Sequence, residues 1–392
     1  MPHLDEAFLD SAESLEALDS RGSLRALATS GAQVRRAIVA AREAGIDRVA
    51  GGDRPRSVLV ASLGGSSVVC DVLDVLAEPG SPVPVTTRRE APLPGWIGPL
   101  DLVIAVSLSG RAQGPLALAA EAARRGASLL TVGASDSPLA DVCARGRGIH
   151  VDVASPAPTS RSALWSMLTP VLLAADGLGL VDCSEAELER VADLLDERAE
   201  ECRPSSESFV NPAKVLALGL AETVPVVLGD GALTGVAAGR AAAMFARTAR
   251  IPTTHGSLPD AASQVVACFD GPFSGAGGAA PDGGSDLFAD PFLDGPPAPQ
   301  LGLLVLRDHP VAPGAPDHLD ALEAGRLADA VVGSARDAGV RVWEVEALGG
   351  HPIERLASLI AMTDYVATYL ALGLGLDPAV SRHVTELRDR TS

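Results

Sequence analysis

Residues 57–67 read SVLVASLGGSS, and this stretch decides the fold. Residues 57–63 form a short apolar run, with Arg-Pro-Arg just before it and two glycines after it, which predicts a buried strand. Residues 64–67 (Gly-Gly-Ser-Ser) follow as a turn, and residues 68–76 predict a helix. A buried strand, a Gly/Ser turn and a helix in this order are typical of a parallel βαβ unit.

The same alternation continues through the first half of the chain. Further short apolar strands are predicted at residues 83–87, 102–107, 128–132 and 149–153. Residues 113–125 predict an Ala-rich helix that ends at Gly126, a typical helix stop. Residues 1–50 and 163–202 are also expected to be helical. Four or five apolar strands separated by helices indicate a parallel sheet with helices on both faces.

The pattern resumes after a Pro/Ser-rich boundary near residues 203–206. Strands are predicted at residues 224–228, 265–269, 301–306 and 341–345, with helices at 235–250 and 319–338. Residues 270–300 are rich in Gly, Pro, Asp and Ala and are expected to form a flexible insertion. We therefore predict an α/β protein with two doubly wound parallel-sheet subdomains and helical N- and C-terminal extensions. The predicted parts are residues 1–50 (helical), 51–203 (first subdomain), 204–350 (second subdomain) and 351–392 (helical tail).

Charge excludes some partners. The 392 residues carry 31 Lys plus Arg and 50 Asp plus Glu, a formal net charge of −19. A nucleic-acid partner is not expected, because such proteins present a basic face. A small anionic substrate is compatible, since a pocket can be locally positive on an acidic protein. Lys214 is the only lysine, so fixed positive charge has to come from arginine, whose planar guanidinium suits phosphate.

No disulfide framework, metal site or membrane partner is expected. The cysteines are widely spaced and form no Cys-x-x-Cys motif: Cys70, Cys143, Cys183, Cys202 and Cys268. The first residues are acidic and include no apolar signal-peptide segment. The most apolar run, residues 356–376, carries Asp364 near its middle and is expected to be a buried helix. These features predict a reduced, cytoplasmic protein.

Three loops rich in serine and glycine follow strands of the first predicted sheet, at residues 63–67, 107–111 and 133–137. Ligands of open parallel sheets bind beyond the carboxyl ends of the strands. Glycines let the backbone approach a ligand, and the helix that follows offers free N–H groups to an anion. The candidate phosphate-binding residues of the first two loops are Gly64, Gly65, Ser66, Ser67, Ser107, Ser109, Gly110 and Arg111.

With these loops the chain resembles the sugar isomerase (SIS) family, a doubly wound fold that binds phosphosugars. The resemblance is carried by ASLGGSSVVCDVL, VIAVSLSGRAQGPLALA and GASLLTVGASDSPLAD, and runs from about residue 22 over nearly the whole chain except residues 270–300. It is nearest to the bifunctional phosphoglucose/phosphomannose isomerase branch, which carries two SIS subdomains. TSRSALWSMLTPVLL places Arg161 at the substrate-contacting arginine of that branch.

The resemblance implies an aldose–ketose isomerase. It would interconvert glucose 6-phosphate or mannose 6-phosphate with fructose 6-phosphate, without a metal or an organic cofactor, and it would form a homodimer. The alternative is a catalytically silent SIS protein that binds a phosphosugar and regulates or scaffolds carbohydrate metabolism.

Departures from the family keep that alternative open. The family's proton-shuttling glutamate falls on Arg247 and its ring-opening histidine on Ser263. Arginine cannot act as the base, because it does not deprotonate in proteins. The nearest groups able to replace the missing pair are Asp260, His255 and His351. Each has a structural alternative: Asp260 as a helix cap, His255 as a solvated loop residue, and His351 as the start of the tail helix.

A second glycine-rich segment could be taken for a nucleotide-binding motif. Residues 229–235, GDGALTG, follow a predicted strand and approximate a dinucleotide fingerprint with one residue too many. No acidic residue ends a following strand at the expected distance. We therefore interpret this segment as the strand-end loop of the second subdomain.

Overall fold

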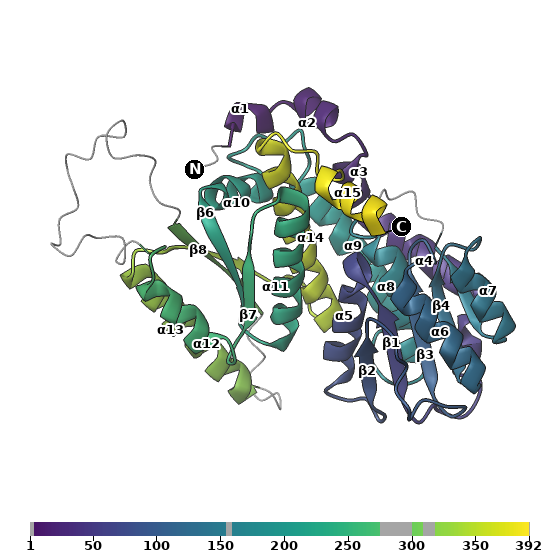
Figure 1. The fold of residues 1–392 in the computed structure, drawn as a ribbon. Helices are drawn as coiled ribbons and strands as arrows, with labels where there is room; N and C mark the ends of the chain where they lie inside the picture. The colour runs from purple at the N-terminus through teal and green to yellow at the C-terminus, as the bar shows by residue number, and fades with distance from the viewer. Residues whose placement is uncertain (1–3, 154–158, 275–299, 309–317, 392) are drawn as a thin grey trace, which may run out of the picture. The chain divides into compact units, whose positions relative to one another are not determined.

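The computed structural model describes residues 4–153, 159–274, 300–308 and 318–391. These residues form two compact units. The N-terminal unit comprises Arg25–Ala199 with His351–Glu354, and the C-terminal unit comprises Met1–Leu24, Glu200–Gly350 and Arg355–Ser392. Each unit is built around one parallel sheet (Figure 1).

The sheet of the N-terminal unit has the order β2-β1-β3-β4-β5, and every pair of neighbours is parallel. Its strands are β1 (Val58–Ser62), β2 (Val85–Arg88), β3 (Leu102–Ser107), β4 (Ser128–Gly133) and β5 (Ile149–Asp152). Its longer helices are α4 (Ser30–Ala44), α5 (Val68–Ala77), α6 (Gln113–Arg125), α7 (Pro138–Arg145), α8 (Leu164–Gly177) and α9 (Glu185–Glu201).

Strand residues alternate between two covered faces. Leu59 and Val103 pack with Leu118 of α6 and Leu139 of α7 in one apolar cluster. Helices α5 and α8 contact the sheet separately from these, and α4 packs on α8. Because both faces are covered, every residue of β1 and β3 is buried, and both strands are apolar up to their last residues, Ser62 and Ser107. This confirms the predicted doubly wound fold.

The C-terminal unit repeats the arrangement with the parallel order β7-β6-β8-β9. Its strands are β6 (Thr223–Gly229), β7 (Thr254–Ser257), β8 (Gln300–Arg307) and β9 (Arg341–Glu346). Its helices include α1 (Glu6–Leu9), α2 (Ala12–Leu18), α10 (Pro212–Ala221), α11 (Ala232–Met244), α12 (Ala262–Ala267), α13 (His318–Asp337), α14 (Pro352–Gly373) and α15 (Arg382–Thr391). Between the units in sequence, α3 spans Ser23–Ala28.

One predicted strand is wrong. Residues 265–269 belong to α12 and the 3₁₀ turn after it. The buried residues here are Ala261, Val265 and Phe269, a spacing of four that suits one face of a helix. The strand missing from the prediction is β7, whose sequence THGS contains no apolar run because it lies at the edge of the sheet and is partly exposed.

Helix α14 is the one helix in the described part of the chain with the length and hydropathy of a membrane span. Its apolar window is 100% buried, as in the core helix of a soluble domain. Asp364, the charged residue in its middle, pairs with Arg240 of α11 at 2.6 Å. Both side chains are buried, so the carboxylate is neutralised inside the C-terminal unit.

Candidate functional site

The strand order of the N-terminal unit has a switch point between β1 and β3. The chain continues from β1 to β2 on one side and from β3 to β4 on the other. At such a point the connections diverge and leave a crevice at the carboxyl ends of the strands. Ser62 and Val106 lie opposite each other at these ends, so the loops at residues 63–67 and 107–111 leave the sheet side by side.

The first loop is held by its own backbone and by residues just before α8. Gly64 has a φ of +68°, a conformation that favours glycine. The Ser66 hydroxyl donates to the Leu63 carbonyl at 3.1 Å, and Ser67 leads directly into α5. A Cβ on Gly65 would lie 3.2 Å from Cγ of Arg161. The structure therefore brings Arg161 against the first loop.

The second loop packs against the third. Gly110 has a φ of +62°, and a Cβ there would collide with Ser137, which caps the start of α7. The Ser107 hydroxyl accepts from the Ala112 N–H at 3.4 Å, and Ser109 accepts from the Arg111 N–H at 3.3 Å. The tight turn leaves Ser109 and Arg111 exposed at the carboxyl end of β3.

A third source of positive charge at this edge comes from the end of β2. Arg88 is its last residue and Arg89 follows, both of them exposed. A Cβ on Gly114 of α6 would collide with the Arg89 carbonyl, so this segment lies against the start of the helix that follows the second loop. Neither arginine was among the predicted site residues, although both follow a predicted strand. With Arg111 and Arg161 they give the edge an arginine-rich character.

The C-terminal unit has the equivalent switch point between β6 and β8. Asp230 follows β6, and its carboxylate accepts the Asp308 N–H at 3.0 Å and the Thr234 hydroxyl at 2.9 Å. Burial raises the pKa of Asp230, and these hydrogen bonds and Arg307 oppose that rise. Its oxygens thus hold the ends of β6 and β8 together, which explains the acidic residue in the GDGALTG segment as a structural anchor.

The three candidate bases lie in different settings. Asp260 is exposed just beyond the carboxyl end of β7. His255 lies within β7, with its ring beside Gly239 of α11, where a Cβ would be 3.4 Å from Nε2. His351 precedes α14, and its Nδ1 accepts the Ile353 N–H at 3.3 Å. Asp260 and His351 thus follow the carboxyl ends of β7 and β9, whereas His255 lies within β7.

The resemblance predicts that Arg247 and Ser263 stand at the positions of the family's glutamate and histidine. Arg247 lies in a π-helical turn, Phe245–Ala249, that ends α11. Turns of this kind are rare and often occur at functional sites. Ser263 is exposed on α12. Within the described ranges, no three His, Cys, Asp or Glu side chains gather to hold a metal ion.

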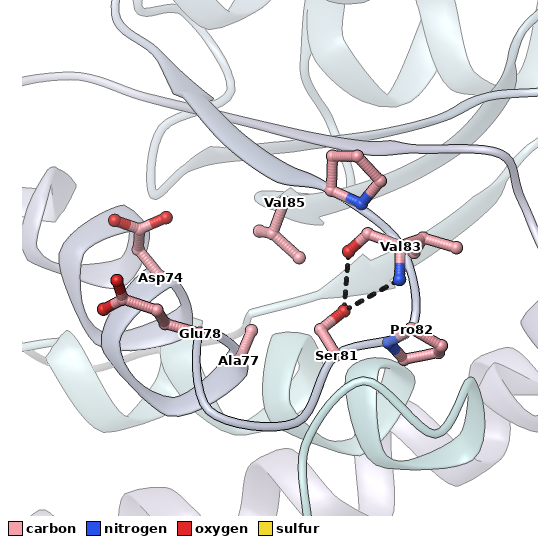
Figure 2. A pocket seen from close by; sticks show the side chains of 8 residues that line it. Asp74, Ala77, Glu78, Ser81, Pro82, Val83 and Val85 are labelled. Atoms are coloured by element: carbon pink, nitrogen blue, oxygen red, sulfur yellow. Dashed lines mark hydrogen bonds between the residues drawn. The ribbon is translucent and has the colours of Figure 1, made fainter.

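Two cavities of the N-terminal unit lie away from the Ser/Gly loops. One, of about 470 Å³, lies between α5 and β2 and is lined by Asp74, Glu78 and Ser81 among others (Figure 2). Burial and the neighbouring Glu78 raise the pKa of Asp74. Two carboxyl groups with no arginine in the lining do not suit a phosphate. The other cavity lies at the amino ends of the strands.

Comparison with known proteins identifies relatives for the sequence and for the fold. Residues 209–391 match the family described as "Bacterial phospho-glucose isomerase C-terminal SIS domain". The chain is 23% identical over 334 residues to a bifunctional phosphoglucose/phosphomannose isomerase from Caldicellulosiruptor bescii, covering 85% of this chain and 88% of that protein.

Two solved structures from Thermus thermophilus share the fold. A hypothetical protein is 14% identical, with a TM-score of 0.68 and coverage of 97% of this chain and 93% of the other. A glucose-6-phosphate isomerase like protein is 20% identical, with a TM-score of 0.53 and coverage of 94% and 96%.

Proposed function

Because the chain belongs to the SIS domain family, near the bifunctional phosphoglucose/phosphomannose isomerase branch, we propose that it is a phosphosugar isomerase. Its substrates would be glucose 6-phosphate or mannose 6-phosphate, interconverted with fructose 6-phosphate. The observation that carries the proposal is the contact of Gly65 with the Arg161 segment beside the β1–β3 switch point.

The phosphate would bind at the first two loops. Gly64, Gly65, Ser66 and Ser67 lead into the start of α5, where backbone N–H groups and the helix dipole favour an anion. The second loop supplies further groups at the neighbouring strand end, namely Ser107, Ser109, Gly110 and Arg111. Arg161 would add a charge-assisted hydrogen bond to a phosphate or sugar oxygen.

Isomerisation needs a base near the sugar carbons. The base takes the proton from C2 of the open-chain aldose while O1 gains a proton, which gives a cis-enediol. O2 then loses its proton as the base returns the C2 proton to C1, which gives the ketose. This chemistry needs no metal or organic cofactor. We propose Asp260 as the first candidate because it is an exposed carboxylate just after β7. His255, which is exposed within β7, and His351, whose Nδ1 already accepts the Ile353 N–H, are the alternatives.

A second candidate function rests on a specific observation. The resemblance places Arg247 where the family carries its glutamate, and a guanidinium cannot accept the C2 proton. A chain with intact phosphate loops and no base would bind the phosphosugar without converting it, and would act as a regulator or scaffold of carbohydrate metabolism. For either function we expect a cytoplasmic homodimer.

A coupled assay decides between the two functions. Purified protein is incubated with glucose 6-phosphate and with mannose 6-phosphate, and fructose 6-phosphate is followed. We expect turnover by the wild type and a fall in kcat of about 100-fold or more in Asp260→Asn. The kcat of Asp270→Asn, which changes a neighbouring exposed aspartate, should equal that of the wild type.

The same samples are heated with and without phosphosugar. Thermal stabilisation by a phosphosugar without turnover would contradict the isomerase function and support the catalytically silent binding protein. Neither turnover nor stabilisation would overturn both functions.

A further inference from the structure

A cleft lies at the amino ends of β3, β4 and β5, at the edge of the sheet opposite to the Ser/Gly loops. Its volume is about 450 Å³, and the first residues of the three strands line it. A volume of this size suits a small-molecule ligand. The proposed isomerase function makes no use of this edge.

The charge of the cleft is opposite to that of the chain. Arg48, Arg54 and Arg147 line it, together with Asp53 and Asp101. The carboxylate of Asp101 is neutralised by Arg56, which does not line the cleft. Three arginines and one remaining carboxylate leave a local charge of about +2 on a protein with a net charge of −19.

The carboxylate of Asp101 is hydrogen-bonded to groups other than the three arginines of the cleft. Its side chain is fully buried and accepts from Arg56 at 2.7 Å, from the Ser57 hydroxyl at 2.7 Å and from the Gly98 N–H at 2.8 Å. Burial alone would raise the pKa of Asp101, but these hydrogen bonds outweigh it and the pKa is lowered. Asp101 therefore does not cancel the arginines of the cleft.

Two of the arginines have no carboxylate partner. Among the described residues, neither Arg54 nor Arg147 forms an ion pair, and both are exposed. Arg48 donates to the Ala44 carbonyl at 2.8 Å, which fixes its guanidinium at the end of α4. The cleft thus presents guanidinium groups whose hydrogen-bonding capacity is not taken up by acidic side chains.

The backbone conformation of Arg147 is unusual for an arginine. Its φ is +55°, in the left-handed region that favours glycine. The Arg147 N–H donates to the Ala144 carbonyl and the Gly148 N–H to the Cys143 carbonyl, a helix-ending turn in which glycine normally takes this position. At the end of α6, on the same edge, Gly126 holds the equivalent position with a φ of +77°. The chain therefore holds an arginine, where α6 has a glycine, in this conformation beside the cleft.

We propose that this cleft binds a small molecule with two or more linked phosphates. Guanidinium groups recognise phosphate oxygens in pairs of hydrogen bonds, and three of them, two from residues 48–54 and one from Arg147, suit more than one phosphate. Leu100, which is 70% exposed, adds an apolar wall. Free pyrophosphate and a nucleoside polyphosphate share the phosphate chemistry. Only the nucleoside polyphosphate has a base that could pack against Leu100.

Calorimetric titration with pyrophosphate and with ATP tests the proposal on the full chain. Arg147→Gly should weaken both ligands by about tenfold or more while leaving the melting temperature unchanged or raised, because glycine suits this backbone conformation. Arg145→Ala, near the end of α7 and outside the cleft lining, should bind as the wild type does.

Further variants separate the sites and the two ligands. Arg111→Ala at the opposite edge should keep pyrophosphate binding; loss of binding there would place the anion on the Ser/Gly loops and overturn the proposal. Leu100→Ser should weaken ATP alone if the ligand is a nucleotide, and leave both affinities unchanged if it is free pyrophosphate. Wild-type affinity in Arg147→Gly, or no binding to the wild type, would also overturn the proposal.

Discussion

Gly65 and Arg161 lie so close that a Cβ on Gly65 would be 3.2 Å from Cγ and 3.4 Å from the backbone nitrogen of Arg161. They are far apart in the chain, yet the segment before α8 rests directly on the first Ser/Gly loop. The absence of a side chain at residue 65 is what allows this contact. The position of Arg161, and with it the proposed phosphosugar site, thus depends on a glycine.

Gly65→Ala should therefore weaken phosphosugar binding by about tenfold with a small loss of stability. The added methyl group would also lie 2.5 Å from Oγ of Ser160, so the Ser160–Arg161 segment has to move. Titration with glucose 6-phosphate measures the effect. Gly80→Ala is the matched control, since a Cβ there meets nothing within 4 Å. Equal affinities for the two variants would contradict the role given to this contact.

Gly110→Ala should lower the free energy of unfolding by about 1–3 kcal/mol. Its φ of +62° disfavours any residue with a Cβ, and that Cβ would collide with Ser137. Urea denaturation gives the difference, with Gly95→Ala as the control because a Cβ at Gly95 lies in open space. A loss no larger in Gly110→Ala than in the control would mean that the second and third loops are not tightly packed.

Arg240→Ala should destabilise the C-terminal unit by about 3–5 kcal/mol, because it removes the ion-pair partner of the buried Asp364 carboxylate. Replacing both residues, with Arg240→Met and Asp364→Leu, should cost much less. Chemical denaturation of the single and double variants measures both effects. If the double variant is as unstable as the single one, loss of the buried ion pair does not explain the destabilisation by Arg240→Ala.

His150 should make stability depend on pH. Burial lowers its pKa; Nδ1 lies 2.7 Å from the Thr131 hydroxyl, while Nε2 is buried with no hydrogen-bond partner among the described residues. The unfolded chain, with a histidine pKa of about 6.5, binds the proton more tightly than the folded one. The contribution of neutral His150 to the free energy of unfolding is therefore complete above that pH. It is lost as the pH falls through about 6.5 toward the lower pKa of the folded state.

Melting temperatures measured between about pH 7.5 and 5.5, on either side of the histidine pKa, check this expectation. His150→Gln should flatten the profile, whereas His383→Gln should not, because the His383 side chain is 91% exposed. Profiles of the same slope in wild type and His150→Gln would show that another group causes the pH dependence.

The strongly apolar elements were predictable from sequence. The predicted strand at residues 102–107 and the helix at 113–125 coincide with β3 and α6, because buried parallel strands and an Ala-rich helix have clear patterns. The helical segment at residues 265–269 was mistaken for a strand because a short apolar run fits both structures. Strand β7 was missed because edge strands need no apolar residues.

Contacts between distant segments were not predictable in the same way. Arg88 reaches the ligand edge only through the strand order β2-β1-β3, which local patterns do not contain. Lys214, the single lysine, donates from Nζ to the carbonyls of Pro204 at 2.9 Å and Ser206 at 2.6 Å, so its charge supports the fold. The family resemblance placed Arg161, but the contact with Gly65 that holds it comes from tertiary packing.

The central claim is that the carboxyl-end loops of the first sheet bind a phosphosugar, and titration of glucose 6-phosphate into wild type, Arg161→Ala and Ser109→Ala tests it most directly. The account predicts saturable binding to the wild type, about tenfold weaker or no binding to both variants, and wild-type affinity in Arg145→Ala, an exposed arginine elsewhere in the same unit. Unchanged affinity in Arg161→Ala and Ser109→Ala would contradict it.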